Sequence, residues 1–566
     1  MRARPCLIVS TVALASGAAL AQPAFSNATG GAGINATHQP LFGDGFLAGG
    51  AVGDFNGDGF QDIFYPTGGG APDRLYLNDG DGTFTDEAAA AGVALAHRST
   101  AAAVADYNND GRLDIFVTSL GSAASSSPGA HRLYHNDGNN VDGVPEFTEV
   151  ATAAGVNASG PASDGFGAAW GDYDIDGDLD LAVAGWGSSQ NNRLFRNDGD
   201  GTFTDVTTSA GLGQMLSSMV GFAPRFADMD GDRYPELIWI GDFGTSLYFR
   251  NDTDGSFTNI TNSTGTGLDG TEMGMTVADF NRDGLFDFYV TTISTNNLYM
   301  NNGAHSFTNR ANESGSANTG WGWGTVAIDF DHDTLTDIVA TTQSGRQWAF
   351  RNTGIVGAIP QFTDVTNASG LTTGISGRGL SNLDIDNDGD QDLVFFPRNG
   401  PLTVFRSDLD MTHGDANWVR VLLESADEPG IAPNGVGSVV KVTVNGQTQM
   451  GRIDAGSNYL SQSELSAHFG LGSANVIDEI RVEWANGEET ILEGVAVNQT
   501  LTIGLDNGCN DADIADPFGS LDFSDIVAFL TAFGTGDQIA DFAEPFGSLD
   551  FSDVLAFLVA FNGGCP

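Results

Sequence analysis

The chain has 566 residues, enough for about three or four domains. Its formal net charge of −51, from 73 acidic and 22 basic residues, argues against a nucleic acid or an anionic membrane as partner. An apolar content of 41% and 37 phenylalanines argue against a disordered acidic chain, so we expect bound cations to neutralise part of the charge.

Residues 1–21 have the pattern of a secretory signal peptide. Arg2 and Arg4 precede an apolar or small-residue stretch over 6–20, and Ala19-Leu20-Ala21 fits a small-x-small cleavage site. The segment is too short to stay as a membrane span, and no later stretch reaches 18 apolar residues. We expect a secreted, extracellular protein without a membrane span.

Seven Asp-rich loops follow, numbered here in chain order: loop 1 (54–62), loop 2 (106–114), loop 3 (172–180), loop 4 (228–236), loop 5 (279–287), loop 6 (329–337) and loop 7 (384–392). Five of them keep the frame D-x-[DN]-x-D-G-x-x-D. Loop 4 has Arg233 for Gly and Glu236 for the last Asp, and loop 6 has Thr334 for Gly.

The spacing of these loops suits a hard cation. Ca²⁺ takes about six to eight oxygen ligands, and a tight loop can supply them from side chains 1, 3, 5 and 9 and from the carbonyl of position 7. Positions 1, 3, 5 and 9 carry 25 carboxylates over the seven loops. Mg²⁺ fits less well because it keeps its waters and demands octahedral geometry.

The candidate ligands are therefore Asp54, Asn56, Asp58, Phe60, Asp62, Asp106, Asn108, Asp110, Arg112, Asp114, Asp172, Asp174, Asp176, Asp178, Asp180, Asp228, Asp230, Asp232, Tyr234, Glu236, Asp279, Asn281, Asp283, Leu285, Asp287, Asp329, Asp331, Asp333, Leu335, Asp337, Asp384, Asp386, Asp388, Asp390 and Asp392. Residues at position 7 contribute only their carbonyl. The alternative is that Asp, Asn and Gly act only as turn formers, which seven copies in one frame make improbable. Loops 4 and 6, which lack glycine at position 6, are expected to bind weakly or stay empty.

Each loop joins two short apolar strands, and a third and a fourth strand follow. The third strands include 74–79, 132–137, 193–198, 247–252 and 297–302, and the fourth begin at Phe84, Phe147, Phe203, Phe257, Phe307 and Phe362. Four strands in about 50 residues predict a propeller blade. The seventh unit lacks a fourth strand, and residues 25–34, which resemble 203–212, are predicted to supply it.

The Asp frame and the N-D-G…F-T-D spacing resemble FG-GAP (VCBS-type) repeats, the blades of integrin α-chain propellers and of cartilage acidic protein-like proteins. The resemblance implies a mainly β fold with a seven-bladed propeller over 22–410 and about seven Ca²⁺ ions. Residues 416–504 resemble the ASPIC/UnbV domain, and Asn445-Gly446 and Asn486-Gly487 predict hairpin turns there. We interpret His468 as a structural histidine.

The C-terminal segment contains a 28-residue repeat, seen in 513–533 and 541–561. Its apolar residues at i, i+3, i+4 and i+7 predict two helices, each after an acidic loop. It resembles a GC-type dockerin, here 509–566, with paired half-EF-hands. Its candidate ligands, for two more Ca²⁺, are Asp513, Asp516, Asp522, Asp525, Asp541, Glu544, Asp550 and Asp553. The loop is one residue longer than usual, so helix capping by Asp522 and Asp550 is a nearly equal alternative. Export favours a disulfide between Cys509 and Cys565.

No catalytic motif such as G-x-S-x-G, H-E-x-x-H or C-x-x-C occurs in the sequence. We therefore expect a non-enzymatic calcium-binding recognition or adhesion protein, with a protein or glycan ligand on the propeller. The dockerin-like segment is expected to attach it to a cohesin-like or cell-surface partner. The alternative is a carbohydrate-active enzyme, a lyase or hydrolase, which an open funnel lined by Arg, Tyr or His at the propeller axis would favour.

Overall fold

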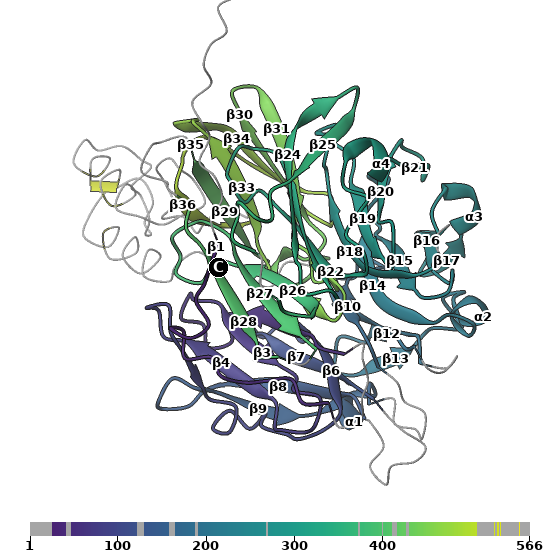
Figure 1. Ribbon diagram of the computed structural model, residues 1–566. Coiled ribbons are helices and arrows are strands. Elements are labelled where there is room, and N and C mark those ends of the chain that lie inside the picture. The colour runs from purple at the N-terminus through teal and green to yellow at the C-terminus, as the bar shows by residue number, and fades with distance from the viewer. Residues whose placement is uncertain are drawn as a thin grey trace, which may run out of the picture.

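The computed structural model describes residues 25–40, 47–120, 130–157, 165–186, 191–267, 270–371, 374–398, 400–409, 416–425 and 430–505. It also describes Ile526, Phe529, Leu530, Phe533 and Val554. Seven antiparallel sheets with four strands from the repeat region follow one another around a ring, and two further sheets form a β domain beside it (Figure 1). The chain is thus mainly β.

The sheets of the ring are numbered here like their loops. Sheets 1 to 3 consist of β2 (Gly50–Gly53), β3 (Asp62–Tyr65), β4 (Arg74–Asn78) and β5 (Phe84–Asp86); β6 (Ser99–Ala105), β7 (Asp114–Ser119), β8 (Arg132–Asn139) and β9 (Pro145–Glu149); and β10 (Ala168–Gly171), β11 (Asp180–Val183), β12 (Arg193–Asn197) and β13 (Phe203–Asp205).

Sheets 4 to 7 repeat the same order. They consist of β14 (Gly221–Ala227), β15 (Glu236–Gly241), β16 (Leu247–Asn251) and β17 (Phe257–Asn259); β18 (Glu272–Ala278), β19 (Asp287–Thr292), β20 (Asn297–Asn301) and β21 (Phe307–Asn309); β22 (Gly322–Ile328), β23 (Asp337–Thr342), β24 (Trp348–Val356) and β25 (Ile359–Asp364); and β26 (Gly377–Leu383), β27 (Asp392–Pro397), β28 (Thr403–Ser407) and β1 (Phe25–Asn27).

The first strands of successive sheets pack side by side, and β26 returns to β2, which closes the circle. The N-terminal strand completes sheet 7, as the sequence predicts. It pairs antiparallel with β28, with Phe25 opposite Ser407 and Asn27 opposite Phe405. This circular order is consistent with a seven-bladed β-propeller in which every sheet packs against a neighbouring sheet on both sides.

Short helical turns follow several fourth strands. They are α1 (Ala151–Ala154), α2 (Gly213–Leu216), α3 (Thr261–Thr264) and α4 (Ala311–Ser314). The first and second strands are buried at nearly every position, and their Val, Ile, Leu and Phe side chains lie between neighbouring sheets, where they form the core of the ring.

The β domain has two sheets. One has the order β33 (Ala467–Gly472), β29 (Asn417–Glu424) and β36 (Gln499–Gly504), and the other has the order β31 (Gln447–Arg452), β30 (Val439–Val444), β34 (Val476–Glu483) and β35 (Glu489–Ala496). A 3-10 turn lies at Pro433–Gly435. The predicted Asn445-Gly446 turn joins β30 to β31 with both residues at positive φ, as this type of hairpin requires.

A segment of the β domain, residues 454–464, enters the axis of the ring, and we call it the plug. Its strand β32 (Ser461–Gln462) runs parallel to β2, so close that a Cβ atom at Gly49 would lie 1.8 Å from the carbonyl oxygen of Leu460. The plug contacts the first strands of all seven sheets, at Gly50, Val104, Trp170, Arg225, Gly274, Thr325 and Leu380. Ring and β domain therefore form one packed unit.

Several predictions fall outside the described residues. These are the signal peptide, the Cys509–Cys565 disulfide and the ligands proposed between Asp513 and Asp553. Ile526, Phe529, Leu530, Phe533 and Val554 have helical backbone, and the rings of Phe529 and Phe533 lie 5.8 Å apart. Phe529 is buried whereas Leu530 is 57% exposed. Among the described residues, no helix has the length and apolar character needed to cross a membrane.

Deletion of residues 22–34 should destabilise the ring out of proportion to its length. The deletion removes β1 and leaves β28 as an unpaired edge, and it uncovers Phe330 in loop 6, against which Phe25 packs edge-on. We expect a lower melting temperature than for deletion of residues 506–566, which leaves all nine described sheets intact. Equal melting of the full chain and the N-terminal deletion would contradict this role of β1.

Candidate metal centre

Every Asp loop joins the first strand of a sheet to the second. Loop 1, for example, lies between the end of β2 at Gly53 and the start of β3 at Asp62. Since the strands of all seven sheets are arranged in the same sense around the ring, the seven loops lie on the same face. The β domain packs on this face, with Trp418 beside Gly389 in loop 7 and Gly430 beside Gly177 in loop 3.

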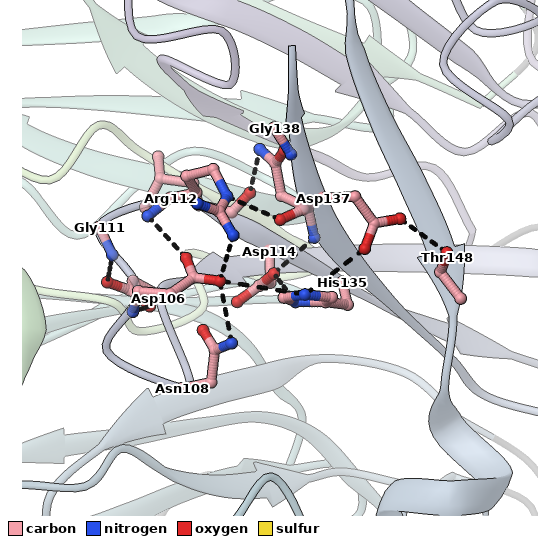
Figure 2. Close-up of polar contacts among 12 residues, drawn as sticks. Asp106, Asn108, Gly111, Arg112, Asp114, His135, Asp137, Gly138 and Thr148 are labelled. Atoms are coloured by element: carbon pink, nitrogen blue, oxygen red, sulfur yellow. Dashed lines mark hydrogen bonds and ion pairs between the residues drawn. The ribbon is translucent and has the colours of Figure 1, made fainter. Parts of the chain in front are cut away.

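The position-1 carboxylate organises each loop by accepting backbone N–H groups. Figure 2 shows loop 2, where Asp106 accepts hydrogen bonds from the N–H groups of Asp110 (3.0 Å) and Gly111 (2.8 Å). Loops 4 and 6 form the bond from position 6 without glycine at that position. Arg233 (φ 80°) and Thr334 (φ 79°) take the left-handed conformation there, at a cost on the order of 1–2 kcal/mol each.

The position-9 carboxylate is buried in every loop. In loop 3, Asp180 accepts the N–H groups of Tyr173 (3.1 Å) and Asn197 (2.9 Å), and it is fully buried. Burial, with the charges of Asp172 and Asp174, raises the pKa of Asp180 well above its ordinary range. Such a carboxylate holds the loop in place and needs a nearby positive charge to be ionised at neutral pH.

Four loops bring three acidic side chains together so that one oxygen from each lies within 4.8 Å of the others. They are Asp172, Asp174 and Asp180 in loop 3, Asp228, Asp230 and Asp232 in loop 4, Asp329, Asp331 and Asp333 in loop 6, and Asp384, Asp386 and Asp392 in loop 7. Loops 1, 2 and 5 have Asn at position 3, and their Asn amide donates to the position-5 carboxylate instead.

Some of these oxygens are buried without a hydrogen-bond partner. Asp174, Asp384 and Asp386 each have such an oxygen, and Asp384 is fully buried. Burial and the neighbouring carboxylate of Glu464 raise the pKa of Asp384 to about 7. A buried carboxylate oxygen that nothing satisfies is costly, and a hard cation is the partner that its chemistry fits.

A basic side chain from the third strand accompanies the loops that have Asp at position 3, which the sequence analysis missed. Asp174, Asp230, Asp331 and Asp386 are matched at the same third-strand position by Arg196, Arg250, Arg351 and Arg406, whereas the three Asn loops have Leu77, His135 and Met300 there. Arg351 forms ion pairs with Asp331 and Asp333, and Arg406 with Asp386.

The arginine pairs with carboxylates of the loop itself in loops 6 and 7, whereas Arg196 and Arg250 form their ion pairs with Asp198 and Asp252, which follow the third strand. In loops 6 and 7 the arginine thus offsets the additional carboxylate that the Asn loops lack. Loop 2 has a histidine instead. His135 contacts Asp114 (3.3 Å) and Asp137 (3.5 Å), and the hydrogen bond to Asp114 raises the pKa of His135 (Figure 2). Comparison of the third strands across the repeats is the signal that reveals this pattern.

Neighbouring sheets are joined at the loops by asparagine side chains. The third-strand Asn of one sheet donates from Nδ2 to the carbonyl of position 2 in the preceding loop, as Asn197 does to Tyr107 (2.8 Å). Six interfaces have this bond, formed by Asn78, Asn136, Asn197, Asn251, Asn301 and Asn352. Any cation that orders one loop therefore also orders the contact with the next sheet.

The axis of the ring is filled rather than open over the described residues. Tyr459 of the plug is fully buried between Phe222 and Trp323, with ring centroids 5.5 and 5.1 Å away. A polar cavity of about 140 Å³, lined in part by Arg225 and Asn458, remains beside the plug. The volume of this cavity is below the roughly 300–1,000 Å³ of a ligand pocket. Over the described residues, the axis of the ring therefore has no open funnel of the kind that would favour the enzyme alternative.

His468 has the structural role that the sequence predicts. Its Nε2 lies 2.8 Å from the carbonyl oxygen of Gly389, and its ring stacks on Trp418. Burial lowers the pKa of His468 to about 4. His332, which is distant in sequence, lies with its ring centroid 5.0 Å from that of His468 and also bonds a carbonyl oxygen, that of Ala416. Both histidines fasten the β domain to loops 6 and 7.

In the metal-free protein, stability should fall between pH 7.5 and 8.5. Burial, followed by the charges of its neighbours, raises the pKa of Asp172 to about 8 and of Glu236 to about 9. The folded state then holds protons that the unfolded chain has released, so each such group lowers the unfolding free energy by up to about 1.4 kcal/mol per pH unit.

The measurement is the melting temperature in EDTA at pH 7.5, 8.0 and 8.5, a range above the ordinary titration of carboxylates and histidines. Excess Ca²⁺ should reverse the slope because cation binding requires ionised carboxylates. A melting temperature in EDTA that does not change over this range would contradict the burial of these groups.

Comparison with known families agrees with this architecture. The chain contains FG-GAP-like repeats, matched at residues 26–117, 172–239, 228–290 and 280–340. It also contains an ASPIC and UnbV domain, matched at residues 430–509. Loops 1 to 6, and the β domain from residue 430 onward with its plug, thus lie within matches to two recognised protein modules.

Proteins similar in sequence include cartilage acidic protein 1 of several animals. The human protein is 31% identical over 195 residues, which cover 33% of this chain and 27% of the relative. The Xenopus tropicalis protein is 24% identical over 482 residues, which cover 80% of this chain and 63% of the relative. The chain therefore spans less than two thirds of the length of these relatives.

Solved structures give weaker similarities. One is a lectin of Agrocybe aegerita, described as recognising non-reducing terminal N-acetylglucosamine, with 21% identity, a TM-score of 0.37 and coverage of 58% of this chain and 83% of that chain. Another is YCF48 of Cyanidioschyzon merolae, with 12% identity, a TM-score of 0.38 and coverage of 66% and 98%. Since both TM-scores lie below 0.5, neither bears on the function of this chain.

Proposed function

We propose that this chain is an exported, calcium-stabilised recognition protein that is not an enzyme. The ring presents a binding face for a protein or glycan ligand, and the dockerin-like segment 509–566, with its own calcium sites and disulfide, attaches the molecule to a cohesin-like or cell-surface partner. The observation that carries the calcium part is the set of buried, unpartnered carboxylate oxygens in loops 3 and 7.

In loop 7 the fit to a hard cation is supported by three acidic residues. Asp384 and Asp392 are fully buried and Asp386 is mostly buried, with one oxygen from each within 4.8 Å of the others. The oxygen-only set of carboxylates and carbonyls is the one that Ca²⁺ prefers. Calcium at this position would neutralise carboxylates whose pKa is raised by burial.

The face opposite the Asp loops is the candidate recognition surface. The β domain covers much of the loop face, whereas connections from second to third strands lie on the other side. There Phe243 is 67% exposed at a positive φ, its ring 6.4 Å from that of Trp186, and the indole Nε1 of Trp186 donates to Asp242 (3.4 Å). Exposed aromatic rings beside a carboxylate suit both glycans and protein side chains.

The test is a glycan-array and pull-down screen of the secreted protein in Ca²⁺ and in EDTA. A ligand should bind in Ca²⁺, and Phe243→Ala should weaken its binding at least tenfold. Val356→Ala is the matched control, because Val356 is also 67% exposed but lies at the turn between β24 and β25 on the loop side. The absence of any ligand in Ca²⁺ would refute the recognition role, and equal binding by Phe243→Ala would refute this face.

Attachment is tested separately with the tail. A chain ending at Asp506 should fold and keep its calcium but no longer associate with the envelope or partner. A fusion of 509–566 to a reporter should gain that association and lose much of it in the Cys509→Ser/Cys565→Ser form. Unchanged association of the shortened chain would refute attachment through the tail.

A further inference from the structure

One cluster in the ring differs in chemistry from the other Asp loops. In loop 4, Asp230 and Glu236 meet His305, which lies in the turn between β20 and β21 of the next sheet. One oxygen of each acidic residue and one ring nitrogen of the histidine all lie within 4.8 Å of one another. The Nε2 atom of His305 is 3.0 Å from Oδ2 of Asp230.

Two departures from the repeat meet at this point. The other six loops have Asp at position 9, where loop 4 has the longer Glu236. The three turns that have the same length as the turn of His305 have glycine at its position, namely Gly82, Gly201 and Gly255. His305 keeps the positive φ of these glycines, at 53°. Both unusual side chains thus extend into the same small volume.

Glu236 offers an oxygen that the protein does not satisfy. Its Oε2 accepts the N–H of Met229 (2.9 Å), but Oε1 accepts no hydrogen bond from any described residue although Glu236 is only 1% exposed. In the other six loops the third-strand N–H fills this second position, as Asn301 does on Asp287 (2.7 Å). Because Glu236 as a residue is almost completely removed from solvent, a positive partner beside Oε1 would offset the hydration that this oxygen has lost.

His305 is held as metal-binding histidines usually are. Its Nδ1 lies 3.2 Å from the hydroxyl of Tyr248, which is 1% exposed, so the far side of the ring is fixed by a hydrogen bond. This contact orients Nε2 toward Asp230. Such an outer hydrogen bond sets the tautomer and the direction of a ligating imidazole.

We propose that Asp230, Glu236 and His305 bind one transition-metal ion of the Zn²⁺ class between sheets 4 and 5. Calcium takes oxygen ligands, whereas Zn²⁺, Co²⁺ and Mn²⁺ accept an imidazole nitrogen beside carboxylates. Three protein ligands leave a fourth position for water, and the side chains of Asp230 (24% exposed) and His305 (13% exposed) allow solvent to reach it. The proposal rests on the proposed function only in placing loop 4 in a series of cation sites.

The test uses the full chain, stripped with a chelator and returned to millimolar Ca²⁺ before Zn²⁺ or Co²⁺ is added. Elemental analysis should find one equivalent of Zn²⁺ that excess Ca²⁺ does not displace, and Co²⁺ should give visible absorption bands of a nitrogen-containing site. His305→Gly restores the residue of the other repeats and relieves the left-handed backbone, so the variant should fold at least as well. It should nevertheless lose the bound Zn²⁺ and the Co²⁺ bands.

Asp174→Asn in loop 3 is the matched control. It should lower bound Ca²⁺ by one equivalent and leave Zn²⁺ unchanged, so failure of the calcium sites and failure of the loop 4 site give different results. Zn²⁺ bound equally by His305→Gly, or displaced from the parent protein by Ca²⁺, would overturn the proposal. In that case His305 forms only an ion pair with Asp230.

Discussion

Removal of Ca²⁺ with EDTA should lower the melting temperature strongly, and renewed Ca²⁺ should restore it. The seven loops place 25 carboxylates at positions 1, 3, 5 and 9. When the cations are removed, these like charges repel one another across a few ångströms without a counter-charge. Each site filled at a calcium concentration 100 times its Kd contributes about 2.7 kcal/mol. Differential scanning calorimetry and elemental analysis of the same samples measure both quantities.

Asp172→Asn distinguishes a metal ligand from a simple turn former. In Ca²⁺ the variant should melt well below the parent protein, because position 1 loses its charge. In EDTA it should melt at the same temperature or higher, because the change removes a 6% exposed carboxylate whose pKa burial raises to about 8. Asp178→Asn, at position 7 of the same loop, is the control and should have a small effect in both. Equal losses for Asp172→Asn in Ca²⁺ and in EDTA would mean that Asp172 is only a cap.

Tyr459→Ala should destabilise the ring as a whole. The side chain is fully buried at the axis against Phe222 of β14 and Trp323 of β22, so its truncation leaves a cavity where several sheets meet. Large-to-small changes of buried aromatic residues cost about 3–5 kcal/mol. Chemical denaturation in Ca²⁺, followed by tryptophan fluorescence, measures the loss.

Phe243→Ala is the control for this experiment, since Phe243 is 67% exposed and its truncation should change the unfolding free energy by less than about 0.5 kcal/mol. The parent protein should also unfold in one transition for ring and β domain, because the plug joins them. A separate, earlier transition of the β domain with an unchanged ring would contradict that coupling.

The ring could be predicted from the sequence because its information is local and repeated. Every unit repeats the same pattern of strands, the Asp loop and a fourth strand that begins at Phe. The fourth strand that sheet 7 lacks at its own end is recognisable in the sequence that begins at residue 25. The loop positions of Asp172, Asp174 and Asp180 follow from the same frame. Whether cations occupy the loops, and where the domains begin and end, stay predictions.

The plug could not be predicted in this way. Its sequence from Asp454 to Glu464 has small and polar residues that read as an exposed loop, and its burial arises from partners far away in the chain. Gln462 bonds both the N–H and the carbonyl of Val104 (2.9 Å each), and Glu464 forms a buried ion pair with Arg420 (2.6 Å). A metal-binding role of His305 could not be predicted, because nothing in the sequence shows that this single histidine in a turn lies beside Asp230.

The long reach of two pairings has a consequence for the order in which the molecule folds. β1 can pair only with β28, whose residues follow some 380 positions later. β2 can pair with β32 only some 410 positions later. A growing chain therefore cannot close the circle until residue 407 has been made, and it cannot fill the axis until residue 464 has been made. Contacts of such sequence separation form slowly. Until then the sheets already made can pack on their neighbours only as an open arc, so late synthesis, rather than the early repeats, sets the time at which the native state appears.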